Sequence, residues 1–346
     1  MNDQFLTDLL NQISVSGREE PVQDVVKRHM KEYADCILDD AMGNVICVLN
    51  PKSPRKIMLS AHADEIGLVI SHITENGRLQ VIERGAIIPS TYPGQQVQIL
   101  TAQGIIYGVV EGRRGTFAKQ DLSAVDFLID IGAKSREEAL EKVELGNPVV
   151  VDIQIRQLLN GRFTARALDD RLGVYIIMEA LKRVREQSES GKKECKEMRC
   201  TAGIYAASTT GEETTKTGAY WTSSRIQPDL AVVVDVTYCS DYSGMNPAEA
   251  GEIELGKGPV LCDSPITAKG LNQKMKECAA RIGVPLQMEM TSRLTHTDGD
   301  QIHFSNQGVP TVFVSIPLRY MHTPAEVADA MDVENCIKLI AEFISH

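Results

Sequence analysis

The chain has 346 residues, more than the roughly 100–200 of a usual single domain, so we expect two structural units. Hydrophobic residues make up 43% and charged residues 24%, as in ordinary globular proteins, which excludes a disordered scaffold. The formal net charge is −11 and no dense Lys/Arg stripe is present, so the sequence argues against nucleic acid as a partner.

The sequence shows neither a targeting pattern nor a cysteine pattern typical of disulfide or zinc-binding domains. The first residues lack a basic region followed by an apolar core, and no stretch approaches the roughly 20 apolar residues of a membrane span. The eight cysteines form no CxxC pair, which argues against a zinc knuckle and against a secreted disulfide framework. We therefore expect a cytoplasmic protein without a membrane partner.

The first part of the chain predicts two helices followed by buried strands. Residues 5–12 and 18–33 carry helical periodicity, and Ser16 with Glu19 resembles a capping box that opens the second helix. Residues 44–50 and 56–63 are short apolar runs bounded by Asn, Pro and Ser, which is typical of strands in a sheet covered on both faces.

The middle of the chain differs in composition and in the spacing of its apolar runs. Residues 66–163 are rich in β-branched residues interrupted by Gly and Pro, with one clear helical segment, "SREEALEKVE". Closely spaced short strands with turn residues between them predict an inserted small β-barrel or sandwich.

After "ARALDDRLG" helices again alternate with apolar strands up to the end of the chain. This alternation predicts an α/β fold with a mostly parallel sheet covered by helices on both faces. The polar stretch 185–199 is expected to be an exposed helix end and loop. The predicted catalytic domain is therefore discontinuous, comprising residues 1–65 and 164–346, with residues 66–163 inserted as a β-rich domain.

Ionisable residues collect at the predicted ends of the apolar runs, where parallel sheets bind ligands. Each has an ordinary structural explanation by itself, but clustered carboxylates repel one another unless a cation lies between them. Two His with several Asp and Glu and no Cys favour zinc, cobalt or manganese. The residues are His62, Asp64, Asp169, Asp170, Glu212, Glu213, Asp235 and His322.

Five motifs in order, "AHADEIG", "ALDDR", "GEET", "VVDVT" and "RYMHTPAE", resemble the M42 family of metallo-aminopeptidases over nearly the whole chain. This is the glutamyl and deblocking aminopeptidase group, some members of which have been labelled endoglucanases. The resemblance implies two divalent ions per subunit. It also implies the ligands: His62 and Asp235 on one ion, Glu213 and His322 on the other, and Asp169 bridging both.

The remaining residues of these motifs have supporting roles by the same resemblance. Asp169 is preferred over Asp170 as the bridge because related zinc peptidases bridge with the first residue of such a pair and join it to the next by a cis peptide. Asp64 is expected to accept the other imidazole N–H of His62 without touching metal. Glu212 is expected to be the general acid/base, taking a proton from the metal-activated water and passing it to the leaving amine.

The implied function is removal of N-terminal residues from short peptides. A related hydrolase of acylated amino acids or glucans, and an inert metal-binding shell protein, are the alternatives. With 5% aromatic residues and one Trp, the sequence fits a glucan cleft poorly. The resemblance also implies a homo-oligomer, a tetrahedral dodecamer with dimer contacts from the inserted domain.

Several positions depart from the family pattern. Thr215 and Thr217 replace the usual Gly and Arg after the Glu pair, and His296 stands where a small residue is more usual. His296 and Asp298 are candidates for a supporting role near the metals. Residues 112–123 lack the Pro-Pro-His run often seen in the inserted domain, so that domain contributes no assigned residue to the site.

Overall fold

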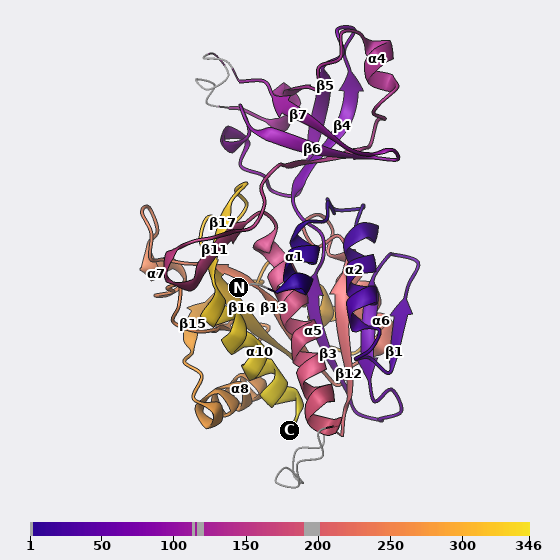
Figure 1. Ribbon diagram of the computed structural model, residues 1–346. Helices are drawn as coiled ribbons and strands as arrows, with labels where there is room; N and C mark the ends of the chain where they lie inside the picture. Colours follow the sequence, from indigo (N-terminus) through magenta and orange to yellow (C-terminus); the bar gives the residue numbers. More distant parts are fainter. Residues whose placement is uncertain (1–2, 113–114, 116–120, 190–200) are drawn as a thin grey trace.

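A computed structural model describes residues 3–112, 115, 121–189 and 201–346 of the chain. A β-barrel lies at one end of the molecule, and a larger sheet flanked by helices forms the rest (Figure 1). Most of the predicted polar loop at 185–199, and most of the atypical segment 112–123, lie outside the described residues. In the part that is described, every cysteine except Cys36 is buried, while Cys195 and Cys200 lie outside it.

The larger sheet has eight strands within the described residues. The central strands β12, β3, β13 and β16 run parallel, while β2 and β14 pair with them antiparallel. This confirms the predicted α/β class with a mostly parallel centre. In spatial order the strands are β1 (Cys36–Asp39), β2 (Val45–Leu49), β12 (Gly203–Thr209), β3 (Lys56–His62), β13 (Leu230–Tyr238), β16 (Thr311–Leu318), β14 (Val260–Asp263) and β15 (Gln287–Met290).

Helices cover both faces of this sheet because successive strand residues point to opposite sides. Val232 and Val234 of β13 join the core formed with α5 and α10, whereas Ala231 and Val233 join the core formed with α6 and α9. On the first face lie α1 (Gln4–Leu10), α2 (Glu20–Met30), α5 (Leu168–Glu189), α8 (Lys269–Ile282) and α10 (Ala330–Ile344); on the second lie α6 (Thr217–Ile226) and α9 (Gly299–Phe304).

The barrel is closed and has its own core, in agreement with the predicted β-rich insertion. Alternate residues such as Leu68 and Ile70 point inward, as expected for a small barrel filled by side chains. Its strands, in chain order, are β4 (Gly67–Ile73), β5 (Leu79–Arg84), β6 (Gln96–Thr101), β7 (Gly104–Val110), β8 (Leu128–Asp130) and β9 (Pro148–Val151), with the short helix α4 (Arg136–Leu140) between the last two.

A small antiparallel sheet connects the barrel to the rest of the chain. It contains β10 (Arg156–Gln157), β11 (Arg162–Ala165) and β17 (Glu326–Asp329). The short helix α7 (Pro247–Ala250) lies beyond β13. No helix in the described part of the chain is both long and apolar enough to cross a membrane.

A buried ionic cluster joins the segment that leads into the barrel to the segment that follows it. Glu65, just before β4, forms ion pairs with Arg166, just after β11, and with Arg171 of α5. Arg171 also donates to the backbone carbonyl of Leu9 at 3.0 Å. Burial alone would raise the pKa of Glu65, but the two guanidinium groups lower it overall.

The predicted capping box is wrong. Helix α2 begins at Glu20, its N-cap is Glu19, and no side-chain capping bond forms. The hydroxyl of Ser16 instead donates to the carboxylate of Asp64, because the preceding residue Val15 pairs with Glu65 and brings Ser16 to the end of β3. Ser16 therefore belongs to the region of the predicted metal ligands.

Candidate metal centre

The predicted site residues come together at the carboxyl end of the central strands. His62 is the last residue of β3, Glu212 and Glu213 follow β12, and His322 follows β16. Asp235 lies within β13 rather than after it, on the side that faces α6 and α9. These positions agree with ligand binding beyond the carboxyl ends of parallel strands.

Asp169, near the start of α5, lies between two imidazoles. Its Oδ1 is 3.1 Å from Nε2 of His62, and its Oδ2 is 3.2 Å from Nε2 of His322. Asp235 Oδ1 lies 4.0 Å from His62 Nε2, and Glu213 Oε2 lies 3.7 Å from His322 Nε2. Each imidazole therefore has one further carboxylate beside it, and Asp169 is shared.

The donor atoms fit a cation. Those of His62, Asp169 and Glu213 lie within 4.8 Å of one another, and so do those of His62, Asp170 and Asp235. Glu213 Oε1 is buried without a hydrogen-bond partner among the described residues. Mixed imidazole and carboxylate donors without sulfur suit zinc, cobalt or manganese.

The pKa shifts of the candidate ligands also favour a bound cation. Burial, followed by repulsion from Asp169, raises the pKa of Glu213 well above its usual range. The pKa of Asp235 is raised by burial too, although His62 opposes the shift. Hydrogen bonds from His322 and His62 lower the pKa of Asp169 despite its burial. A positive ion between these carboxylates would offset the cost of keeping them charged.

Asp170 is held tightly next to Asp169. The peptide bond between them is cis, as the resemblance led us to expect. Asp170 Oδ1 accepts the backbone N–H of Gly173 at 3.0 Å, and a Cβ at Gly173 would lie only 2.3 Å from Asp170 Oδ2, so only glycine fits there. Oδ2 is buried without a hydrogen-bond partner among the described residues, and burial raises the pKa of this carboxyl.

Asp64 connects three segments behind the site. Its carboxylate accepts the backbone N–H groups of Glu212 at 3.0 Å and Glu213 at 3.2 Å, as well as the hydroxyl of Ser16. Nδ1 of His62 lies 3.4 Å from Asp64 Oδ1 and 3.2 Å from the Asp64 backbone oxygen. Asp64 thus orients one imidazole and both glutamates.

Glu212 lies between His62 and Lys216. Its Oε2 is 4.0 Å from His62 Nε2, and its Oε1 is 2.9 Å from Nζ of Lys216, which also lies 3.5 Å from Asp300. Burial raises the pKa of Glu212 to about 7, against the lowering effects of His62 and Lys216. A carboxyl with a pKa near neutrality suits proton transfer in both directions.

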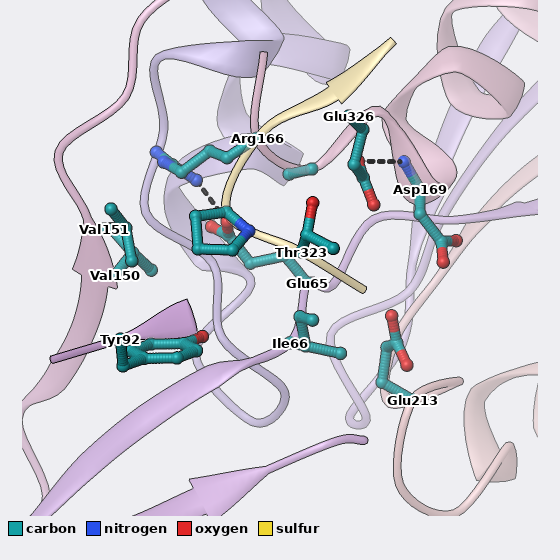
Figure 2. Close-up of a pocket in the computed structure, with 12 residues that line it drawn as sticks. Glu65, Ile66, Tyr92, Val150, Val151, Arg166, Asp169, Glu213, Thr323 and Glu326 are labelled. Atoms are coloured by element: carbon teal, nitrogen blue, oxygen red, sulfur yellow. Dashed lines mark hydrogen bonds and ion pairs between the residues drawn. The ribbon is translucent and has the colours of Figure 1, made fainter. Parts of the chain in front are cut away.

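The sequence reasoning missed Glu326. This buried residue at the start of β17 accepts the backbone N–H groups of Leu168 at 2.8 Å and Asp169 at 3.2 Å through Oε2. Its Oε1 accepts the N–H of His322 at 3.1 Å. Figure 2 shows Glu326 beside Asp169, in a small pocket that Tyr92 of the barrel also lines. The available signal was its position at the end of the motif "RYMHTPAE", four residues after His322.

A cleft of about 700 Å³ opens over the site and contains His62, Asp169, Glu212 and His322 among its lining residues. Two residues singled out in the sequence have different surroundings. His296 is exposed and lines the cleft, whereas Asp298 is buried and accepts the hydroxyl of Ser60 at 3.0 Å.

Comparison with known proteins gives a consistent result. The family model described as M42 glutamyl aminopeptidase matches residues 43–339. The lysyl aminopeptidase of Pyrococcus furiosus is 34% identical over 97% of this chain and 94% of its own. The TET aminopeptidase of Thaumarchaeota archaeon SCGC AB-539-E09 has a TM-score of 0.91 at 29% identity, with 99% and 95% of the two chains covered. The Pyrococcus horikoshii TET1 peptidase has a TM-score of 0.84 at 29% identity, with 98% of each chain covered. The chain therefore belongs to the M42 peptidase family.

Proposed function

We propose that this protein is a metal-dependent aminopeptidase that removes N-terminal residues from short peptides through a dinuclear site. One observation carries the proposal: each carboxylate oxygen of Asp169 faces a different imidazole, His62 on one side and His322 on the other. This is the arrangement needed for a carboxylate shared by two cations. The family match supports a peptidase but leaves the number of ions to experiment.

The donor set divides naturally into two groups around Asp169. His62 and Asp235 would hold one ion, and Glu213 and His322 the other. Ions bound there would polarise the scissile carbonyl and lower the pKa of the attacking water. Asp64 would hold the ligands in place without touching metal. Asp170 is proposed to support Asp169 in the same way; it is also the alternative shared ligand, because its donor atom lies within 4.8 Å of those of His62 and Asp235.

Glu212 is proposed as the general acid/base. It is buried at the cleft beside Glu213, and its pKa is raised to about 7. It would take a proton from the attacking water and deliver it to the nitrogen of the leaving amine. Lys216, 2.9 Å from its other oxygen, would keep Glu212 oriented across this transfer.

Two alternatives make different demands on the site. A glycosidase uses a pair of carboxylates flanking a sugar and has no need for the two imidazoles. An inert metal-binding shell has no need for Glu212 beside a complete ligand set. The observed constellation favours peptide hydrolysis over both.

The test is hydrolysis of aminoacyl p-nitroanilides after removal of metal with a chelator and re-addition of zinc, cobalt or manganese. We expect activity on substrates with a free amine only when metal is restored. Equal cleavage of N-acetylated substrates would contradict the aminopeptidase proposal. Metal binding without cleavage of any substrate would favour the inert shell.

Assembly is a further part of the proposal. The Pyrococcus horikoshii TET1 peptidase assembles into a tetrahedron or a large octahedral shell, and the present chain covers 98% of it. We propose that this chain is also a homo-oligomer, with the inserted domain of residues 66–163 supplying dimer contacts. A molar mass from light scattering equal to that of a single chain would contradict this.

A further inference from the structure

Glu289 is a partly buried carboxylate in the cleft that has no role in the proposed reaction. Glu289 lies on β15 at the far side of the cleft from His62, and both residues line it. We infer that Glu289 selects peptides whose N-terminal residue has a positively charged side chain, lysine or arginine. This inference rests on the proposed aminopeptidase function and names the substrate class for the same site.

Strand register places Glu289 over the same face of the sheet as the metal centre. Asp235 pairs with Ser315 of β16, Ser315 pairs with Val260 of β14, and Cys262 of β14 pairs with Glu289. Paired residues in neighbouring strands point to the same side, and so do residues two apart on one strand. Asp235 and Glu289 therefore lie on the same face of the sheet, on strands β13 and β15, with β16 and β14 between them.

The spacing suits a long side chain. Thr237 is two residues beyond Asp235, about 7 Å along the strand, and its hydroxyl hydrogen-bonds the carboxylate of Glu289. An extended lysine side chain spans roughly 6 Å from Cα to Nζ, from five bonds of about 1.5 Å. A substrate whose α-amine and scissile carbonyl lie at the metal centre can thus place its ammonium group beside Glu289.

Charge complementarity points to the same substrates. Burial raises the pKa of Glu289, and no cation among the described residues contributes to lowering it. A lysine or arginine side chain would supply that missing charge, whereas a neutral side chain would leave the carboxylate uncompensated and an acidic one would be repelled. A carboxylate at this position therefore discriminates between substrates by the charge of their side chain.

Apart from the metal centre and Lys216, two other charged residues line the cleft. Arg293 is exposed on the segment that follows β15, and Glu249 is exposed on α7, where it accepts a hydrogen bond from Asn246 at 3.3 Å. If Arg293 controlled selection, acidic N-terminal residues would be preferred. Glu249, being solvated, is expected to add little to discrimination.

The experiment compares lysyl, arginyl, norleucyl and glutamyl p-nitroanilides with the full-length, metal-loaded protein. Norleucine matches lysine except for the ammonium group. We expect kcat/KM for the lysyl substrate to exceed that for the norleucyl one by about 10- to 100-fold, the range for a hydrogen bond to a charged group. Glu289→Gln should bring this ratio close to one, and Glu289→Lys should shift preference toward the glutamyl substrate.

Controls separate the possible failures. Glu277→Gln on α8 removes the same charge from an exposed position outside the cleft and should leave the ratio unchanged. Calorimetric titration with free lysine and free norleucine should show the same preference, and the same loss in Glu289→Gln. A ratio that falls in Glu249→Gln but not in Glu289→Gln, or a glutamyl preference lost in Arg293→Ala, would overturn the inference while leaving the aminopeptidase function intact. Failure to cut every substrate would instead contradict the proposed function.

Discussion

Glu326 holds the backbone of Asp169 through one carboxylate oxygen and the backbone of His322 through the other. Asp169 is the second residue of α5 and His322 follows β16, so these two residues come from segments more than a hundred positions apart in the sequence. Glu326 lies on β17, which pairs with the strand leading into α5. A single buried side chain therefore fixes the distance between the proposed bridging ligand and one of the proposed histidine ligands.

Glu326→Gln is expected to weaken metal binding by about 10- to 100-fold, the usual cost of losing a group that orients metal ligands. The amide has only one acceptor oxygen, so its NH₂ group would face a backbone N–H on one side. Competition with a chromophoric chelator measures the affinity. Glu334→Gln, a partly exposed glutamate of α10 that pairs with Arg183, serves as control. Unchanged affinity in Glu326→Gln would mean that the loops are held by their own packing.

Glu212→Gln tests the proposed acid/base. The variant keeps the shape of the side chain and its distance from Lys216, so both metals should remain bound. The value of kcat should fall by about two to four orders of magnitude, as expected for loss of a general acid/base group. Elemental analysis and steady-state kinetics on one preparation check both parts. Loss of metal would indicate that Glu212, rather than Glu213, is the ligand.

Ser16→Ala separates the two interpretations of Ser16. A lost helix cap would cost about 1 kcal/mol of folding stability with or without metal. The structure instead has the hydroxyl donating to Asp64, which orients His62 and the backbone of Glu212. We therefore expect a measurable loss of metal affinity by chelator competition and little change in the unfolding free energy of the metal-free protein. The reverse pattern would restore the capping interpretation.

The sequence predicted which side chains meet at the candidate site better than it predicted what holds them there. Ionisable residues at the ends of apolar runs identify His62 and the Glu212–Glu213 pair, because a polar group that interrupts a buried strand is visible in the local pattern. Glu326 was missed because Leu168 and Asp169, the residues whose backbone it holds at the start of α5, are brought to it only by the pairing of β11 with β17. Such contacts leave no local periodicity.

The same limit applies to the fold. The central strands are long apolar runs and were predicted, as was the barrel. Strands β14 and β15, the last two at one end of the sheet, were not predicted individually because both are short. β15, the edge strand, alternates polar and apolar residues over only four positions, "QMEM". Ser16 was misassigned for a related reason: a Ser followed three residues later by Glu satisfies a local rule, but a buried carboxylate from a distant strand competes for its hydroxyl.

Glu65→Gln tests the junction between the barrel and the sheet. Glu65 is buried between Arg166 and Arg171, and removing its charge leaves two buried guanidinium groups without their counter-ion. Breaking such a cluster costs roughly 3–5 kcal/mol. Urea unfolding of the chelator-treated protein and variant at neutral pH measures this difference without contribution from bound metal.

The pH dependence of that difference has a definite sign. Because the pKa of Glu65 is lower in the folded protein than the ordinary value of 4.5, its charge stabilises the fold fully above about pH 4.5. The stabilisation is lost as pH falls below 4.5 and through the folded-state pKa. The gap between wild type and Glu65→Gln should therefore be constant from pH 7 to 5 and narrow in more acidic solution. A gap that is unchanged below pH 4.5 would show that Glu65 acts through packing alone.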